Sequence, residues 1–500
     1  MLSDVNAILP VLTVALTALV ILAADWFLPP DDPRPPVWLA LASLVATGLV
    51  ILQAWGPAMT PTPAFSQAPV GSGGAVTAVA WVWHDSFGLF AAGILVLTAM
   101  VTVLLSADYA RRRPALARAE YYVLVLIAIA AMMLVGMAND LILIFLGIET
   151  FSIALYILCG FVRGDRLSHE AALKYFVLGA FAAGFLLYGI ALVYASTGTT
   201  NLSLIGRALA AGAGSLPGVT YVGLGLILVG LGFKVAMAPF HQWTPDVYEG
   251  APLTVTALMA AGTKTAAFAA LARVLWSGFA PLADAWLPLL GALAVVTMVV
   301  GNLAALVQVD LKRMLAFSAV AHAGYLLVAV VAGSPAGTSA MLFYLLVYAL
   351  MNLGAFGVLV ALGPVGPSGR DATNLADLRG MAARHPGLAL ALAVFLFSLT
   401  GLPPTAGFLG KWYIFQAAVA SDHAWLAVAV VLNSVLSAFY YLRPVLLMAL
   451  ADPADLQPIT VPRASAAAVT LAAVAVGLLI ILSVPLGAGL RAAVMAGALP

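Results

Sequence analysis

The stretch Gly232-Phe233-Lys234-Val235-Ala236-Met237-Ala238-Pro239 places a lysine and a proline inside an otherwise apolar run. Proline lacks a backbone donor and interrupts a helix, and the backbone groups that it frees need polar surroundings. Lysine, unlike arginine, can lose its proton in a buried position. The pattern therefore favours a membrane helix that is broken beside a group able to exchange a proton.

The composition around this stretch is that of a chain embedded in lipid. Hydrophobic residues make up 64% of the 500 residues and charged residues only 8%, whereas soluble domains carry about 25% charged residues. So few charges cannot cover a water-facing surface of this size. We therefore expect a lipid bilayer to be the main solvent. The net charge of +1 is too small to attract nucleic acid, so we expect no nucleic-acid partner.

Apolar runs of about 20 residues, the length that crosses a bilayer, recur along the whole chain. No basic segment precedes the first run, so we interpret it as a span and not as a cleaved signal. The other loops are short, and the Pro-, Gly- and Ala-rich loop at 56–83 receives no functional assignment. We predict one membrane domain over residues 1–500, with fourteen helices near 5–28, 37–56, 83–106, 119–138, 140–162, 170–197, 218–240, 252–276, 286–308, 313–332, 338–362, 387–420, 424–449 and 464–485.

The placement of basic residues supports this even number of crossings. With the N-terminus outside, fourteen Lys and Arg fall in cytoplasmic loops and adjoining helix ends. The opposite side receives only three, namely Arg207, Arg491 and Arg273, the last of which lies near a helix end. This asymmetry is the positive-inside bias of membrane proteins. Lys312, beside Arg313, is interpreted as one of the loop charges that set this orientation.

Two predicted helices are interrupted, the seventh near Pro239 and the twelfth at Gly401-Leu402-Pro403-Pro404. They lie five helices apart, and an odd spacing places them in opposite orientations. That layout is typical of inverted repeats. We therefore predict an all-α membrane protein of about fourteen transmembrane helices, with two inverted five-helix repeats at 119–276 and 286–449.

Four of the five lysines lie inside predicted helices, while the arginines lie in loops or near helix ends. A charged side chain at mid-membrane costs about 2.5–3.5 kcal/mol on insertion scales. Lys264 and Lys411 lie in the middle of their segments and Lys234 lies beside a break, so we interpret all three as groups whose protonation changes. Lys174 lies only a few residues inside its helix, where snorkelling of the side chain to the interface is a serious alternative.

Three further polar residues are candidates for the same site. Glu149 lies about ten residues into its predicted helix, where an unpaired carboxylate is costly, so we expect a lysine partner and favour Lys234. A purely structural ion pair is the alternative. His322 lies in the tenth predicted helix, where a hydrogen-bonded core histidine is equally compatible. His241 follows Pro239, and interfacial packing is its alternative role.

The sequence offers no ligand set for a cofactor. Cys159 is the only cysteine, so the chain can form neither an internal disulfide nor a Cys/His metal motif. No glycine-rich nucleotide-binding pattern follows a predicted strand. We therefore expect no cofactor or metal in this chain.

Three stretches resemble the N-type antiporter-like subunit of respiratory complex I. They are 232–252, which contains Pro239-Phe240-His241-Gln242-Trp243-Thr244-Pro245, then Lys264-Thr265-Ala266-Ala267-Phe268-Ala269, and Gly401-Leu402-Pro403-Pro404-Thr405-Ala406-Gly407-Phe408 with Lys411. The related M-type subunit usually has glutamate where Lys411 stands. The L-type subunit has a long helix after its last span, whereas about fifteen residues follow the predicted helix end at Pro485. Both points favour the N type.

The resemblance implies a protein that translocates protons without redox chemistry of its own. It implies a proton route through Glu149, Lys234, Lys264 and Lys411, with Lys174 near Glu149. It also implies neighbouring M-type and small K/J-type membrane subunits in a bacterial inner membrane. NAD, FMN, iron–sulfur clusters and quinone are expected in partner subunits.

Other functions use the same sequence features. A subunit of a multi-subunit cation/proton antiporter or of a membrane-bound hydrogenase would share the fold. A secondary solute transporter would require a substrate pocket at the membrane midplane. An inert membrane spacer is disfavoured by the four lysines inside helices.

Overall fold

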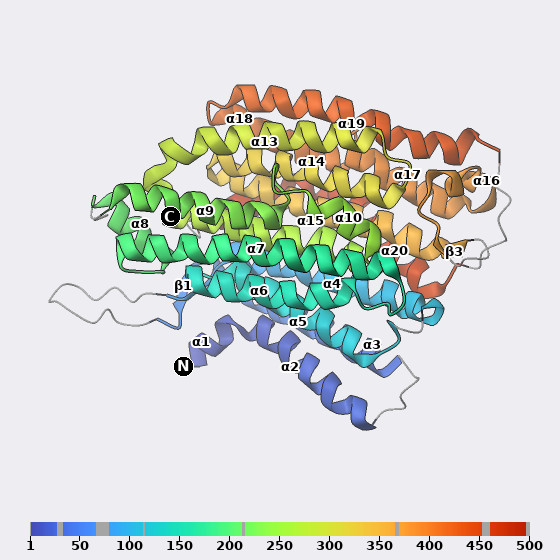
Figure 1. The fold of residues 1–500 in the computed structure, drawn as a ribbon, viewed down its shortest axis with the longest axis horizontal. Helices are drawn as coiled ribbons and strands as arrows, with labels where there is room; N and C mark the ends of the chain where they lie inside the picture. Colours follow the sequence, from blue (N-terminus) through green and yellow to red (C-terminus); the bar gives the residue numbers. More distant parts are fainter. Residues whose placement is uncertain are drawn as a thin grey trace.

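Helices that run side by side along the longest axis make up the fold (Figure 1). The computed structural model describes residues 2–27, 34–66, 80–113, 116–212, 216–365, 370–452 and 461–496. Helices α1 and α8 lie at one end of the bundle, and α16 and strand β3 lie at the other (Figure 1). The all-α membrane fold predicted from the sequence is confirmed.

The helices follow one another with few other elements between them. Those up to the first break are α1 (Leu2–Ala7), α2 (Leu9–Ala24), α3 (Arg34–Trp55), α4 (Ser86–Arg112), α5 (Ala119–Met137), α6 (Leu141–Cys159), α7 (Arg166–Thr197), α8 (Leu202–Ala210) and α9 (Pro217–Val235). Those after it are α10 (Trp243–Gly250), α11 (Leu253–Leu258), α12 (Lys264–Arg273), α13 (Ala283–Leu306), α14 (Leu311–Ala332), α15 (Pro335–Leu362), α16 (Met381–Arg384), α17 (Pro386–Thr400), α18 (Ala406–Ala420), α19 (Ala424–Leu450) and α20 (Arg463–Ala496).

Two small antiparallel hairpins are the only sheets among the described residues. Strand β1 (Thr62–Ala64) pairs with β2 (Val82–His84), and β3 (Pro364–Val365) pairs with β4 (Arg370–Asp371). The first hairpin closes the two ends of the loop predicted at 56–83, of which residues 67–79 lie outside the described part of the chain.

Thirteen helices among the described residues are long and apolar enough to cross a membrane. The twelfth predicted crossing is not among them, because its two halves, α17 and α18, have only 15 residues each. Counted together as one interrupted crossing, they bring the number to the predicted fourteen.

The helix ends at the two breaks have a local cause. Helix α9 ends where Ala236 adopts a left-handed conformation with a φ of 62°, and α10 begins only after the Pro239 link. Helix α17 ends where Gly401 has a φ of 83°, which glycine adopts without steric cost. The last carbonyls of each half-helix therefore have no partner within the helix.

The predicted end of the last helix at Pro485 is wrong. Helix α20 continues through this proline to Ala496. Within a membrane bundle, neighbouring groups can satisfy the backbone positions that a proline frees, so proline alone does not end a helix there.

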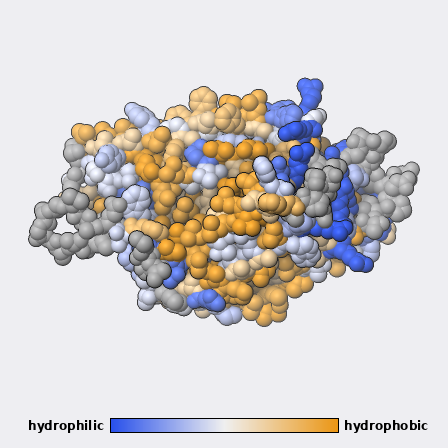
Figure 2. Space-filling view, turned by 90° about the horizontal axis from the view of Figure 1, so that it is seen from below, coloured by the Kyte–Doolittle hydropathy of each residue, from blue (hydrophilic) through white to orange (hydrophobic). Residues whose placement is uncertain are grey.

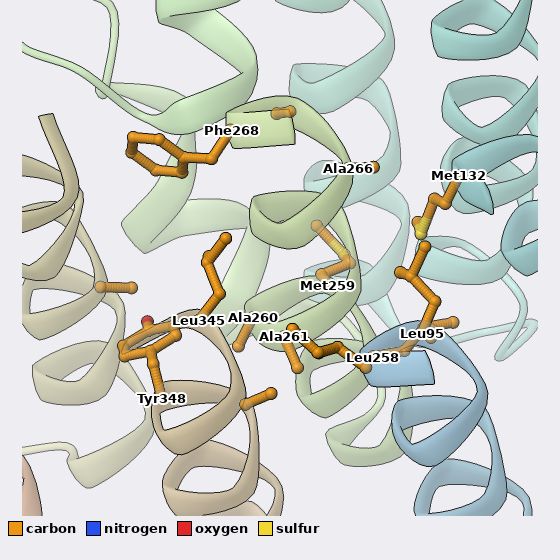
Figure 3. Close-up of a cluster of buried hydrophobic side chains, with 14 of the residues drawn as sticks. Leu95, Met132, Leu258, Met259, Ala260, Ala261, Ala266, Phe268, Leu345 and Tyr348 are labelled. Carbon is orange, nitrogen blue, oxygen red and sulfur yellow. The ribbon is translucent and has the colours of Figure 1, made fainter. Parts of the chain in front are cut away.

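The core lies along three of the four crossings between Leu253 and Leu362, namely Leu253–Gly278, α14 and α15, whereas α13 between them in sequence is only partly buried. The most apolar window of the segment Leu253–Gly278 is 100% buried and those of α14 and α15 are 94% buried, against 28% for the first span. Figure 3 shows Leu345 and Tyr348 of α15 beside Ala260 and Ala261. Side chains on these helices are therefore shielded from lipid.

The outer surface has the opposite character. Apolar residues cover the middle of the molecule, and hydrophilic residues gather toward one end (Figure 2). Large apolar side chains on the outer helices are mostly exposed, among them Leu52, Phe181 and Ile481. Lipid is the solvent that makes such a surface stable.

We expect the end that carries α16 to face the cytoplasm, because the basic residues predicted there exceed those opposite. Ser66 and Ala376 are exposed at opposite predicted sides, and the native Cys159 is buried. A membrane-impermeant maleimide should therefore label Ser66→Cys from outside the cell and Ala376→Cys only from the cytoplasmic side. Labelling of both positions from one side would contradict the fourteen-crossing map.

Candidate functional site

Lys264 lies at the centre of the bundle, on the crossing that is wholly buried. A π-helical turn, η4 (Met259–Thr263), precedes it, and such turns are frequent at functional sites. Its side chain is 1% exposed, and Nζ donates a hydrogen bond to the Val235 carbonyl at 3.1 Å. Val235 is the last residue of α9, so the lysine amine binds the open carbonyl end of a broken helix.

Lys411 repeats this arrangement at the second break. Its Nζ donates hydrogen bonds to the carbonyls of Leu399 and Thr400, at 3.1 and 2.8 Å, which are the last two residues of α17. The amine also lies 4.6 Å from the ring centroid of Tyr325, a cation–π distance. The two mid-membrane lysines are therefore both held by carbonyls at helix breaks.

Lys234 has different surroundings, although it belongs to the first break. Its Nζ donates to the Ser152 hydroxyl at 2.8 Å, and its side chain is buried. Four aromatic rings lie around the amine at 5.3–5.9 Å from their centroids, those of Phe151, Tyr156, Tyr175 and Phe233. The face of an aromatic ring attracts a cation, so this pocket accommodates the charged form without a carboxylate in contact.

The predicted direct pair of Glu149 and Lys234 is absent from the described ion pairs. The two charges lie within electrostatic range, but Ser152, one turn along α6, takes the hydrogen bond of the lysine. Glu149 is half-buried, and its Oε1 atom is buried with no hydrogen-bond partner among the described residues. One oxygen of this half-buried carboxylate is therefore a buried acceptor that no described group uses.

His322 lies between the two central lysines, and both act on it electrostatically. The ring is fully buried. Nδ1 shares a hydrogen bond with the Tyr344 hydroxyl at 2.7 Å, and Nε2 shares one with the Tyr441 hydroxyl at 3.0 Å. Tyr441 in turn bonds to the Ser318 hydroxyl. His322 is therefore a hydrogen-bonded core histidine within electrostatic range of two buried lysines.

Lys174 and His241 lie outside this line of contacts. Lys174 is 40% exposed and pairs with Glu170 at 2.7 Å and with Asp246 at 2.6 Å. Asp246 also pairs with Arg313 at 2.8 Å, so the cluster ties α10 to α7 and α14. His241 is half-buried in the link between α9 and α10, and its Nδ1 has no partner among the described hydrogen bonds.

Sequence reasoning missed two buried cations. Arg273 is 2% exposed, although it was predicted at a helix end, and its guanidinium donates to both carboxylate oxygens of Asp85 at 2.7 and 2.9 Å. Lys312 is 5% exposed, although it was predicted as a loop charge, and it lies in the first turn of α14. Neither position has a sequence signal of burial, because both lie near the ends of apolar runs.

The described residues contain no group of three or more His, Cys, Asp or Glu that could hold a metal ion. The chemistry available at this site is therefore that of amines, one imidazole, hydroxyls and a carboxylate. All of these groups can bind or release protons, or carry them through hydrogen bonds.

Comparison with known proteins identifies the group to which this arrangement belongs. The family described as NADH:quinone oxidoreductase/Mrp antiporter, TM, matches residues 138–437. NADH-quinone oxidoreductase subunit N of Trichlorobacter lovleyi is 44% identical over 446 residues, which cover 89% of this chain and 87% of the relative. Subunit N of Chloroflexus aggregans is 44% identical over 95% of both chains. The chain belongs to the NADH-quinone oxidoreductase subunit N family.

Solved structures agree with this membership. A chain of respiratory complex I from Thermus thermophilus is 35% identical with a TM-score of 0.78, covering 97% of this chain and 99% of that one. A chain of the Mrp complex from Dietzia shares the fold with a TM-score of 0.82, at 22% identity and with coverage of 99% and 98%. This subunit N protein is therefore an antiporter-like, proton-pumping membrane subunit of NADH-quinone oxidoreductase, in a bacterial inner membrane.

The buried Arg273–Asp85 pair generates a stability prediction. Removing one partner leaves an unpaired buried charge, so Arg273→Met should lower the free energy of unfolding by about 3–5 kcal/mol. The double variant Arg273→Met with Asp85→Asn should recover part of this loss. The melting temperature of the purified protein in mild detergent checks this, with the exposed Arg379→Met as control. Equal melting temperatures for Arg273→Met and the control would show that the pair contributes nothing.

Proposed function

We propose that this subunit moves protons along a line of side chains formed by Glu149, Lys234, Lys264, His322 and Lys411. Quinone reduction elsewhere in the complex would drive the movement, and this chain would carry out no redox step. The observation that supports the proposal most strongly is the pair of central lysines held by backbone carbonyls. A lysine without a carboxylate in contact can lose its proton and leave no unpaired anion behind in the bundle.

Hydrogen bonds and backbone neighbours connect part of the line, and electrostatic interactions relate the remaining groups. Lys234 is followed directly by Val235, whose carbonyl accepts from Lys264. Both central lysines act on His322, and Lys411 lies at the far break. A proton that leaves Lys234 therefore has protonatable groups ahead of it as far as the second break.

The two breaks support the predicted inverted repeats at 119–276 and 286–449 within a single membrane domain. In the first repeat Lys264, from the next crossing, binds the last carbonyl of α9. In the second repeat Lys411, from the other half of the interrupted crossing, binds the last two carbonyls of α17. We propose that this shared arrangement reflects a common structural unit used twice, in opposite orientations.

The two ends of the line are the proposed contacts with neighbouring membrane subunits of the M type and the small K/J type. At one end, Glu149 is half-buried, with one buried carboxylate oxygen that has no hydrogen-bond partner among the described residues, and Leu146 and Ile153 beside it are exposed. At the other end, Lys411 borders an apolar cavity of about 530 Å³ between α18 and α19. An acid at one end and an amine at the other suit head-to-tail contact between related subunits.

The remaining assignments follow from the same proposal. NAD, FMN, iron–sulfur clusters and quinone would bind in partner subunits. Lys174 and His241 are secondary candidates, Lys174 for holding α10 through Asp246 and His241 for proton exchange at the first break. A cation/proton antiporter or hydrogenase subunit is the alternative, and the partner chains that copurify in gentle detergent would distinguish it.

Lys264 tests the centre of the line. Lys264→Ala should abolish most proton pumping in inverted vesicles while the complex still assembles, because removing a buried charge favours membrane insertion. Pumping is measured by a pH-sensitive dye during NADH oxidation, and assembly by the amount of this chain in the purified complex. Wild-type pumping by this variant would remove Lys264 from the route.

Coupling between Glu149 and Lys234 tests the first step. The carboxylate stabilises the charged lysine across Ser152, so Glu149→Ala and Lys234→Ala should each reduce pumping, and the double variant should lose much less than the two losses combined. Glu149→Asp should keep much of the activity and Glu149→Gln should not. Strictly additive losses would show that the two residues act independently.

A further inference from the structure

A polar cavity of about 340 Å³ opens on the predicted cytoplasmic side, where helix ends from both halves of the chain meet. It lies between the ends of α4, α6 and α10, the starts of α7, α11 and α14, and strand β4. Its lining includes Tyr109, Asp165, Ser168, Glu249, Asp371 and Lys312. Such a lining of acids, hydroxyls, one buried amine and the guanidinium groups of Arg113 and Arg370 suits water rather than an apolar ligand.

Lys312 is the buried cation of this cavity. Its Nζ donates to the Glu249 carbonyl at 2.9 Å and to the Ala251 carbonyl. Those two bonds use two of the three N–H groups of the ammonium, and the third has no protein partner among the described hydrogen bonds. No carboxylate forms an ion pair with it in the described part of the chain, although Asp371, Asp310 and Glu249 act on it electrostatically. Lys312 thus has the same kind of surroundings as Lys264 and Lys411.

Buried polar atoms without protein partners are found on the helices that lead from Lys312 toward the centre. They are Thr244 Oγ1, Tyr348 Oη and Asn352 Oδ1, of which the last two belong to side chains that lie close to each other without a hydrogen bond of normal geometry. Buried polar groups nearly always have a partner, so unpartnered ones mark positions for ordered water. Tyr348 is within electrostatic range of both Tyr248, which precedes Glu249, and Tyr441. Its ring centroid lies 5.0 Å from that of His322.

We propose that Lys312 loads protons into the centre of the subunit directly from the cytoplasmic cavity. The neutral amine takes a proton from cavity water, and the ammonium then passes one to water held at Thr244, Asn352 and Tyr348. Both ring nitrogens of His322 are bonded to tyrosine hydroxyls, so the Tyr441 hydroxyl relays the proton: it accepts one from this water and gives its own to His322 Nε2. Each transfer moves one proton and leaves the donor ready to accept another. This inference rests on the proposed function and adds an entry that bypasses Glu149 and Lys234.

A purely structural role is the competing explanation, because Lys312 also caps the carbonyl end of α10. Arginine separates the two roles. It keeps the positive charge and can donate to the same carbonyls, but it does not release its proton. If Lys312 only caps the helix, Lys312→Arg should pump normally. If Lys312 loads protons, Lys312→Arg should assemble normally and lower coupled proton pumping at least about tenfold, and Lys312→Met should lower it similarly.

The experiment uses the intact complex in inverted vesicles and measures pumping together with the amount of assembled subunit. A second variant, Val162→Trp, fills the cavity without changing a charge and should also slow pumping, whereas Leu52→Trp on the exposed face of α3 should not. Normal pumping by Lys312→Arg and Val162→Trp, with Lys264→Ala inactive, would overturn this inference and leave the proposed function intact. Normal pumping by Lys264→Ala would overturn the proposed function itself. If Lys312→Arg fails to assemble, Val162→Trp decides the question alone.

Discussion

Backbone carbonyls at interrupted helices constrain the whole structure. A helix that ends inside lipid leaves its last carbonyls without partners, and each one costs several kcal/mol unless a donor is supplied. This chain supplies lysine amines. Lys264 binds the end of α9, Lys411 binds the end of α17, and Lys312 binds the end of α10. The amines stabilise the breaks, and the negative ends of the helix dipoles stabilise the amines. Fold and candidate site therefore share the same contacts.

Most of the fold could be predicted from the sequence because the chain is embedded in lipid. Because backbone groups in a membrane must be satisfied within the helix, length and hydropathy identify nearly every crossing. The two breaks were predicted from Pro239 and from Pro403-Pro404, and the helices end next to both. Pro485 was misread by the same rule, because α20 continues through it. A proline signals the loss of a backbone donor, and only the surrounding packing decides whether the helix ends there.

The site was less predictable than the fold, because its partners leave no mark in the sequence. A lysine in the middle of an apolar run is predicted to be buried, and this prediction was correct for Lys264 and Lys411. Every residue has a backbone carbonyl, so the sequence could not indicate which carbonyls accept hydrogen bonds from these amines. Their opposite charges predicted a contact between Glu149 and Lys234. The lysine amine instead donates its hydrogen bond to Ser152 and is surrounded by four aromatic rings. Lys312 lies beside a basic residue at a helix start, which is also where orientation charges are found.

The choice of carbonyls over carboxylates has a consequence for proton movement. If a buried lysine in contact with a carboxylate released its proton, it would leave an unpaired anion in the bundle, which is strongly unfavourable. A carbonyl partner stays neutral throughout. An ammonium that loses one proton still has two N–H groups, so neutral Lys411 can keep both of its hydrogen bonds to Leu399 and Thr400. The backbone at the break therefore remains satisfied in either protonation state. Protonation can change without rearranging the helices, and the one carboxylate of the proposed line, Glu149, is half-buried and forms no ion pair with these amines among the described residues.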